Sequence, residues 1–456
     1  MNIKEIIQNQ RLYFQKGHTL SIKFRVQALK GLLTSIDRYN KEIIEALRLD
    51  LNKSSFEAYM TEIGMVKEEI SYQIKHVAKF CRKKRVKTPL SQFKSKSYTF
   101  PSPFGITLIM SPWNYPFQLT ISPLADAIAA GNCVIVKPSA YAPATAEILD
   151  KIIRETFVPE HVCTVLGGRE ENTELLAQKY DMIFFTGGSS TGRVVAKAAA
   201  ENLTPTVLEL GGKSPCIVNE DANISLAAKR IVFGKFLNAG QTCVAPDYVL
   251  VHKSVHTALL ESLKEQIIAL YGENALENLQ YPKIINKKHF CRILSLIAPD
   301  KTVFGGDYNE NALQIQPTIL DGVTFTDKIM SEEIFGPVLP IIEFETFGQI
   351  SSAIAHNPTP LALYYFGKES EFKQKILREI QFGGGCVNDT IIHLATTYMG
   401  FGGVGESGMG AYHGKTGFFA FSHMKSIVEK STAVDLPVRY PPYSEKKEKM
   451  LRKILK

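Results

Sequence analysis

Paired cysteines and long apolar runs are both missing from this sequence. The seven cysteines are odd in number, and no two of them lie within four residues of each other. A disulfide framework or a zinc knuckle needs closely spaced pairs, so we expect reduced thiols and no metal site. No apolar segment approaches the ~20 residues that span a bilayer.

The sequence also lacks the marks of export and of nucleic-acid binding. Its first residues, MNIKEIIQNQRLYF, carry charged and amide side chains where a signal peptide has an apolar run. The formal net charge of +8 is modest for 456 residues, and no RNA- or DNA-binding motif accompanies it. We therefore expect a cytoplasmic protein of two or three domains that binds no nucleic acid.

The first half of the chain predicts helices followed by an α/β domain. Residues 3–83 place apolar side chains at helical spacing, and residues 84–104 look like an extended excursion or hairpin. From residue 105 to residue 210, helical stretches alternate with the short apolar runs GITLIM, CVIVKP, CTVLG, MIFFTG and TVLEL. Continuous apolar runs separated by helices indicate parallel strands covered on both faces. That pattern is typical of a doubly wound domain.

A second alternation begins at Gly211. Its predicted strands are PCIVNE, DYVLVHK, PVLPIIEF and LALYYFG. We therefore predict an α/β protein with two doubly wound α/β domains that meet near residues 210/211, plus an extended arm. The segment GGVGESGMG is too rich in glycine to predict regular structure.

Cys243 lies in the polar stretch NAGQTCVAPDY. Its neighbours Gly240, Gln241 and Thr242 are small or polar, whereas a core cysteine behaves as a small hydrophobe. Glycine lets the backbone turn sharply and exposes amide N–H groups, which suits a thiol that must reach a substrate. Cys243 is therefore a candidate nucleophile, with a buried structural thiol as the alternative.

Glu209 is a candidate base. It ends the predicted strand VLEL, at the edge where open α/β sheets bind ligands. A carboxylate there is costly unless it is solvated, paired or working as a base. A general base and a salt-bridged edge carboxylate are both consistent with this position.

Two predicted strands end at residues that could bind a nucleotide. Lys137 follows VIV, while Gly187, Gly188 and Gly192 follow FFT and open a predicted helix. A glycine turn at a helix N-terminus lets backbone N–H groups approach a phosphate. The spacing differs from GxGxxG, so the standard dinucleotide fingerprint is absent.

Taken together, these stretches resemble the aldehyde dehydrogenase superfamily. SPWNYPFQL, VIVKPS, FFTGGSSTG, LELGGKSP, NAGQTCVAPDY and EEIFGPVLP occur in the family's order and spacing over nearly the whole chain. The segments GGCVNDT, YHGKTGF and RYPPY look most like the class 3, fatty-aldehyde-type branch. The resemblance implies a Rossmann-like NAD(P)-binding domain at residues 1–83 and 105–210 and a catalytic domain at residues 211–395. Residues 84–104 and 396–456 would be oligomerisation and bridging segments with a C-terminal tail.

The resemblance implies NAD(P)-dependent oxidation of aldehydes to carboxylic acids. Cys243 would attack the aldehyde to give a thiohemiacetal, whose oxyanion Asn114 and the Cys243 backbone N–H would stabilise. Oxidation by the nicotinamide would leave a thioester, and Glu209 would activate the water that hydrolyses it. A free thiol with a pKa of ~8.5 is only a few per cent thiolate at neutral pH, so Cys243 needs local activation that the sequence does not identify.

Five further residues would bind the cofactor if the resemblance holds. Lys137 would bond the adenine-side ribose, and Gly187 and Gly192 would flank the pyrophosphate. Glu333 would hold the nicotinamide-side ribose, with Phe335 packed against the cofactor. A capped turn with a core aromatic is the alternative for this last pair.

Cofactor choice can be read from Ala140. The wider family often has an acidic residue at this position, where it grips the ribose 2′-hydroxyl. Without a carboxylate, a 2′-phosphate meets no charge repulsion and finds Lys137 nearby. We therefore expect NADP to be used beside NAD.

The substrate and the oligomeric state rest mainly on the resemblance. The class 3 branch and the aromatic residues Trp113, Tyr115 and Phe117 favour medium- or long-chain apolar aldehydes. Relatives of this branch form homodimers, and we expect a homodimer here.

The tail SEKKEKMLRKILK raises a separate question. Its apolar residues share one helical face among basic ones; they are Met450, Leu451, Ile454 and Leu455. Such a pattern can lie weakly on an anionic inner membrane surface. A frayed, solvated tail is the alternative that we favour.

Three other functions compete with aldehyde oxidation. A relative that passes the acyl group to coenzyme A or phosphate would not need the water-activating Glu209. A non-catalytic protein on this scaffold would not need Cys243, Glu209 and Asn114 together. A cysteine hydrolase would need a partner for Cys243, yet no histidine obviously pairs with it, and the nucleotide-site features would have no purpose.

Overall fold

The N-terminal part of the chain is helical in the computed structural model, which describes residues 2–455. Its helices are α1 (Ile3–Gln15), α2 (Ile22–Arg38), α3 (Asn40–Leu51), α4 (Ser55–Ala58) and α5 (Gly64–Phe80). A π-helical turn, Tyr59–Ile63, joins α4 to α5. The helices bury their apolar face, as the helical spacing predicts.

The first sheet has six strands in the order β17-β7-β6-β3-β4-β5. Five of them are parallel: β3 (Ile106–Met110), β4 (Cys133–Lys137), β5 (Val162–Thr164), β6 (Met182–Thr186) and β7 (Thr206–Glu209). These are the five strands predicted from the apolar runs.

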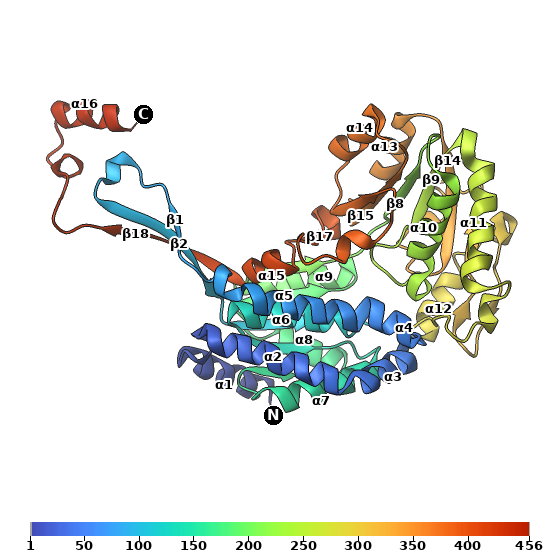
Figure 1. Cartoon of the computed structure of the whole chain (residues 1–456), viewed down its shortest axis with the longest axis horizontal. Coiled ribbons are helices and arrows are strands. Elements are labelled where there is room, and N and C mark those ends of the chain that lie inside the picture. Colours follow the sequence, from blue (N-terminus) through green and yellow to red (C-terminus); the bar gives the residue numbers. More distant parts are fainter. Residues whose placement is uncertain (1, 456) are drawn as a thin grey trace.

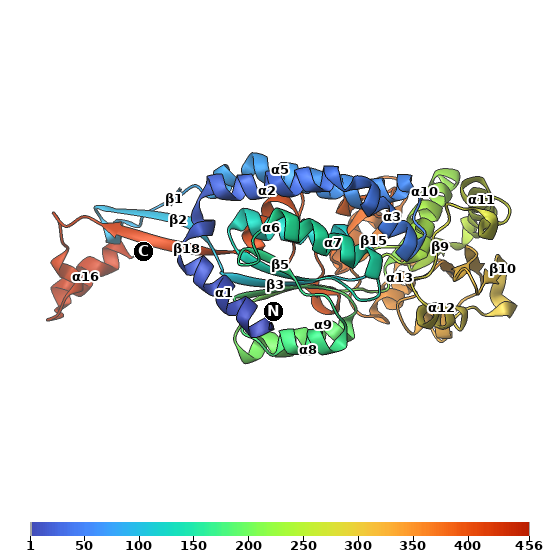
Figure 2. The same ribbon diagram turned by 90° about the horizontal axis from the view of Figure 1, so that it is seen from below.

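Helices cover both faces of this sheet (Figures 1 and 2). α6 (Gln118–Ala130) and α7 (Pro143–Thr156) pack on one face together with α2 and α5. α8 (Arg169–Leu176), α9 (Ser189–Glu201) and α1 contribute to the core on the other face. Along β3, Ile109 joins one core while Ile106 and Leu108 join the other, which explains why the strand carries apolar residues on both of its faces.

The topology of the first sheet locates a binding edge. The chain moves outward from β3 through β4 to β5, and then returns to the other side of β3 with β6 and β7. Ligands of doubly wound sheets bind at the carboxyl ends of the strands beside such a switch point. Asn114 and Gly187 lie in the segments that follow β3 and β6, and Glu209 is the last residue of β7.

The second sheet has seven strands in the order β10-β13-β14-β9-β8-β15-β16. They are β8 (Pro215–Val218), β9 (Tyr248–His252), β10 (Thr302–Phe304), β13 (Thr318–Leu320), β14 (Val338–Phe344), β15 (Ala362–Phe366) and β16 (Gly384–Val387). Only β10 pairs antiparallel. A small hairpin, β11 (Tyr308–Asn309) with β12 (Gln314–Ile315), lies apart from it. The four strands predicted after residue 211 are confirmed as β8, β9, β14 and β15.

Two helical layers also cover the second sheet. α10 (Ile224–Phe236) and α11 (His256–Tyr271) belong to one core, and α12 (Lys287–Leu294), α13 (Phe347–Ala355) and α14 (Glu371–Glu379) to the other. The first of these cores continues into the core of the first sheet, so the two α/β units share apolar packing.

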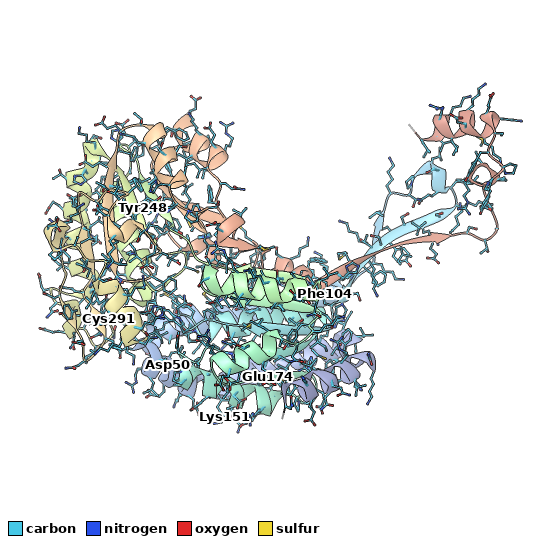
Figure 3. All side chains as sticks on the ribbon, turned by 180° about the vertical axis from the view of Figure 1, so that it is seen from behind. Asp50, Phe104, Lys151, Glu174, Tyr248 and Cys291 are labelled. Atoms are coloured by element: carbon cyan, nitrogen blue, oxygen red, sulfur yellow. The ribbon has the colours of Figure 1, made fainter. Side chains whose placement is uncertain are left out.

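An antiparallel arm projects from the body (Figures 1 and 2). It consists of β1 (Lys84–Val86), β2 (Ser95–Pro103) and β18 (Ser422–Lys430), and it begins beside Phe104, which Figure 3 labels. The predicted excursion at residues 84–104 is thus a hairpin that gains a third strand. Beyond the arm lies α16 (Glu445–Ile454), which has no buried side chain. The tail is exposed, and it forms a regular helix where the sequence favoured a frayed end.

The glycine-rich segment before the arm departs from the sequence prediction. It contains β17 (Gly408–Met409), which pairs antiparallel with β7 and sets Gly408 opposite Glu209. A Cβ on Gly408 would lie 2.5 Å from the carbonyl oxygen of Leu208, so glycine is what allows this approach. The chain then forms α15 (Gly414–Ala420). The domain limits at 83, 210 and 395 stay a prediction.

No helix among residues 2–455 is both long enough and apolar enough to cross a membrane.

Candidate active site

Two cavities meet at Cys243. The larger has a volume of about 390 Å³, and its lining includes Asn114, Gly187, Glu209, Cys243, Glu333 and Phe335. The smaller has a volume of about 180 Å³, and its lining also includes Cys243. The structure therefore gathers six of the eight residues predicted from the sequence around one space.

A strained turn presents Cys243 to both cavities. Asn238 and Ala239 each adopt a left-handed φ of 51°, and Gly240 follows with a φ of 74°. A Cβ on Gly240 would lie 2.3 Å from the carbonyl oxygen of Gly336. Glycine is therefore required where the nucleophile loop packs against the segment that carries Phe335.

Asn114 is buried in the turn between β3 and α6, and its amide lies against the cysteine loop. Asn114 Nδ2 donates to the carbonyl oxygen of Gln241 at 3.0 Å. A side-chain amide has two N–H donors, so one remains for a ligand in the cavity. Asn114 thus lines the same cavity as Cys243 with a free donor.

Glu209 sits at the end of β7, where its side chain is buried. Neither of its carboxyl oxygens has a hydrogen-bond partner among residues 2–455. Burial raises the pKa of Glu209 well above its ordinary value, because the charged form is poorly solvated. Once ionised, such a carboxylate is a stronger base than an exposed one.

The thiol of Cys243 is held in its protonated form by its surroundings. Burial, followed by the carboxyls of Glu333 and Glu209, raises the pKa of Cys243. The backbone N–H groups of Cys243 and Val244 act in the opposite direction. Among the causes of this shift, the ionisable groups are the carboxyls of Glu333 and Glu209, and both favour the protonated thiol.

Glu333 and Phe335 line the larger cavity. Burial, followed by Asp247, raises the pKa of Glu333 to about 8. Phe335 adopts a left-handed φ of 48° and meets the Trp113 ring edge-on at a centroid distance of 5.4 Å. A buried ion pair supports this segment: Lys213 Nζ lies 2.5 Å from Asp247 Oδ2, and Asp247 Oδ1 accepts from the backbone N–H of Ile334 at 3.0 Å.

Lys137 and Gly192 do not line either cavity in the structure. Lys137 Nζ donates to the carbonyl oxygens of Pro138 and Gly167 at 2.9 and 2.7 Å. Gly192 lies inside α9, where a Cβ would come within 2.5 Å of Leu210 Cδ2. The structure gives Gly192 a role in close helix packing, and its predicted cofactor contact stays a prediction, as does that of Lys137.

The smaller cavity is lined almost entirely by apolar side chains. They include Met60, Met65, Phe233, Leu237, Ile391 and Leu394. Of the three aromatic residues expected to face the substrate, only Tyr115 lines this cavity, and its hydroxyl lies 2.6 Å from Thr242 Oγ1. Trp113 lines the larger cavity, and Phe117 is fully buried in the core at the start of α6. These three aromatic residues therefore do not line one cavity together.

Sequence reasoning missed two residues of the larger cavity, His289 and Arg292. Both lie on α12, and the Arg292 guanidinium donates to the carbonyl oxygens of Glu333 and Ile334 at 3.3 and 2.6 Å. No motif marks them, since α12 reads as an ordinary amphipathic helix. Residues 2–455 contain no cluster of three or more His, Cys, Asp or Glu side chains arranged to hold a metal.

Comparison with known proteins decides the family. The sequence model of the aldehyde dehydrogenase family matches residues 1–427. The chain belongs to this family. It is an oxidoreductase, and this aldehyde dehydrogenase uses NAD(P) to oxidise aldehydes.

Relatives match over nearly their whole length. The 4,4′-diaponeurosporen-aldehyde dehydrogenase of Staphylococcus aureus is 45% identical, covering 97% of either chain. The dimeric, NADP-preferring aldehyde dehydrogenase of Canis lupus familiaris is 41% identical, covering 96% of this chain and 98% of its own. A structure titled as the substrate-bound state of Staphylococcus aureus AldH superposes with a TM-score of 0.98 at 44% identity and covers 100% of both chains.

The larger cavity of this aldehyde dehydrogenase fits a nicotinamide dinucleotide. Gly188, at the start of α9, has nothing within 4 Å of the place where a Cβ would be, and no side chain caps the helix there. The first backbone N–H groups of α9 are therefore open to a phosphate. Glu333 and Phe335 stand at the other end of the same cavity, next to Cys243.

Proposed function

We propose that this enzyme oxidises medium- or long-chain apolar aldehydes. The observation that carries the proposal is the apolar cavity that reaches Cys243 and does not include Glu333 in its lining. An apolar tail seated there leaves its carbonyl at the sulfur.

The residues around the sulfur have distinct proposed roles. Cys243 Sγ, after losing its proton, attacks the carbonyl carbon, and Asn114 Nδ2 with the Cys243 backbone N–H donates to the oxygen as it becomes negative. The dinucleotide, when bound, supplies the two-electron oxidant. Glu209 then takes a proton from the water that releases the acid, using the carboxyl oxygens that are free of other hydrogen bonds.

The length of the aldehyde tests the proposed substrate class. An apolar cavity of about 150 Å³ accommodates benzene, so 180 Å³ holds roughly seven carbon atoms. Each buried methylene is worth about 0.8 kcal/mol, or roughly fourfold in kcat/KM. We expect kcat/KM to rise with chain length up to about eight carbons and then to level off. A flat profile from two to twelve carbons would refute the apolar substrate class.

We propose that NADP serves beside NAD. Ala140 is exposed and carries no charge, and the Lys137 ammonium keeps one N–H beyond its two backbone contacts. Ala140→Glu should lower kcat/KM for NADP by at least about tenfold more than for NAD, because the carboxylate would repel a 2′-phosphate. Wild-type enzyme that shows no turnover with saturating NADP would overturn the proposal.

We also propose a homodimer built through the arm. β18 forms one edge of the arm, and its exposed apolar side chains are Met424, Ile427 and Val428. An edge strand with apolar side chains favours pairing with another chain. Light scattering should give twice the mass of the chain, and removal of the arm hairpin at residues 84–103 should give monomers. A monomeric full-length chain would contradict it.

The basic tail supports a weaker proposal, contact with an anionic membrane surface from the cytoplasmic side. On α16, Met450 and Leu455 are exposed beside Lys449, Arg452 and Lys453. Such a helix can rest on anionic lipid, weakly because it is short. Deletion of residues 444–456 should abolish co-sedimentation with vesicles that contain phosphatidylserine. Equal sedimentation of both proteins would leave the tail solvated and remove the proposal.

A further inference from the structure

A buried ion pair outside both cavities contacts the loop of Asn114. Lys53 and Glu62 have no exposed surface, and Lys53 Nζ lies 2.5 Å from Glu62 Oε1. Burying two charges is costly, and their attraction offsets the cost only when the remaining hydrogen-bonding capacity is also used. In this protein the remaining donors and acceptors of the pair form hydrogen bonds with the backbone around Asn114.

The ion pair holds the segment 114–118 at both ends. Lys53 Nζ donates to the carbonyl oxygen of Asn114 at 3.2 Å. Glu62 Oε2 accepts from the backbone N–H groups of Phe117 and Gln118 at 2.9 and 3.1 Å. These N–H groups begin α6, so the carboxylate caps the helix that follows the Asn114 turn.

The same carbonyl oxygen links the turn to the nucleophile loop. Asn238 Nδ2 donates to the Asn114 carbonyl at 2.8 Å, and Asn114 Nδ2 donates to the Gln241 carbonyl at 3.0 Å. Glu57 Oε1 accepts from the backbone N–H of Asn238 at 3.0 Å. The Asn114 turn and the loop that ends in Cys243 are thus fastened to each other and to residues 53–62.

The π-helical turn Tyr59–Ile63 accounts for the placement of these residues. A π turn adds one residue to a helical turn and is often found at functional sites. Here it points Glu62 into the interior while Met60 and Thr61, on the same turn, line the apolar cavity. One turn therefore contributes to the wall of the substrate cavity and to the support of the oxyanion donor.

We propose that Lys53 and Glu62 are positioning residues that hold the Asn114 amide at its working distance from Cys243 Sγ. Neither side chain lines a cavity, so they act through Asn114 and do not touch substrate. This rests on the proposed roles of Asn114 and Cys243. A misplacement on the order of 1 Å can cost about a hundredfold in rate, so a buried support of this kind has a large effect.

Glu62→Gln tests the proposal with little change in side-chain size. We expect kcat to fall about tenfold or more, while KM for the dinucleotide changes by less than about twofold. Asp50→Asn is the matched control, because Asp50 is also buried and accepts from the backbone N–H groups of Ala144 and Thr145 at the start of α7, at 3.2 and 2.8 Å. Asp50→Asn should lower the melting temperature but change kcat by less than about threefold.

A double-mutant cycle distinguishes a positioning effect through Asn114 from a non-specific disturbance of the structure. If Glu62 acts through Asn114, adding Glu62→Gln to Asn114→Ala should cost less than about twofold further in kcat. The rate at which iodoacetamide alkylates Cys243 does not depend on an oxyanion donor. In Glu62→Gln this rate should stay within about twofold of the wild-type rate. Full additivity of the two substitutions, or a Glu62→Gln loss no larger than that of Asp50→Asn, would overturn the proposal.

Two further variants protect the test. If Glu62→Gln does not fold because Lys53 is left unpaired, the neutral pair Lys53→Met with Glu62→Gln removes that charge. This double variant should fold and still lose about tenfold or more in kcat; wild-type kcat in it would refute the positioning role. Asn114→Ala with unchanged kcat would instead refute the proposed oxyanion role, which keeps the two failures distinct.

Discussion

The two cavities that share Cys243 differ in almost every respect. The lining of the larger includes glycine backbone, Glu209, Glu333 and Asn114 beside apolar side chains, and much of it comes from segments at the strand ends of both sheets. The smaller is lined by methionine, leucine, isoleucine and phenylalanine side chains, mostly from helices and from the segment at residues 391–395. The larger cavity is characterised by polar groups that are held in fixed positions, and the smaller cavity is characterised by its apolar space. Under the proposed function, the larger cavity carries the reacting groups and the smaller selects among aldehydes.

Removing the shared sulfur should have the largest effect. Cys243→Ala should lower kcat by at least about a thousandfold, because no other group at this point can form the covalent intermediate. The dissociation constant for NAD, measured by fluorescence titration, should change by less than about threefold, since the rest of the larger cavity is intact. Residual activity within tenfold of wild type would show that the two cavities do not meet at the nucleophile.

Asn114→Ala should have the next largest effect. Loss of one oxyanion donor typically costs about a hundredfold in kcat. Because the donor acts on the carbonyl oxygen and not on the tail, the loss should be equal for butanal and decanal. A loss that depends on chain length would assign Asn114 to substrate binding instead.

Filling the smaller cavity should change specificity without changing the chemistry. Ala395→Phe places a ring in this cavity and should lower kcat/KM for decanal by about tenfold relative to propanal, since several methylenes lose their burial. Ser190→Ala, on the wall of the larger cavity, is the control and should leave that ratio unchanged. An equal loss of kcat/KM for both aldehydes would show that the tail of the substrate does not occupy the apolar cavity.

The smallest effect that we predict is a pH-dependent change in melting temperature, caused by Glu333 in the larger cavity. Glu333 has an ordinary pKa of 4.5 that burial raises to about 8, so the folded state binds this proton more tightly than the unfolded state. Its contribution to stability is present below about pH 4.5 and is lost as pH rises through 8. Glu333→Gln should therefore gain a few degrees in melting temperature relative to wild type at about pH 9 and none at about pH 4. An equal difference at both values would mean that Glu333 does not carry the shifted pKa.

Much of the fold was readable from the sequence because its strands are continuous apolar runs. Each of the five runs between residues 105 and 210 became a strand of the first sheet, and the lone cysteine in a polar loop does face a cavity. The two-residue strand at Gly408 was missed, since glycine there signals close backbone approach, which composition does not reveal.

The support of the site could not be predicted at all. Lys53 and Glu62 lie in a helical, charged stretch of the kind that usually faces solvent. Their burial depends on a π-helical turn and on long-range contacts. Lys53 contacts Asn114, which lies 61 positions further along the chain, and Glu62 contacts Phe117, which lies 55 positions further. Long-range contacts of this kind leave no local pattern in the sequence.

The most direct test of the account is the mass of the enzyme during turnover. Glu209→Gln should slow hydrolysis of the thioester more than its formation, so an acid quench after mixing with NAD and octanal should trap the acyl group on the protein. We predict an increase equal to one octanoyl group, carried by the peptide that contains Cys243. A protein of unchanged mass during active turnover, or an octanoyl group on another cysteine such as Cys291, would contradict the account.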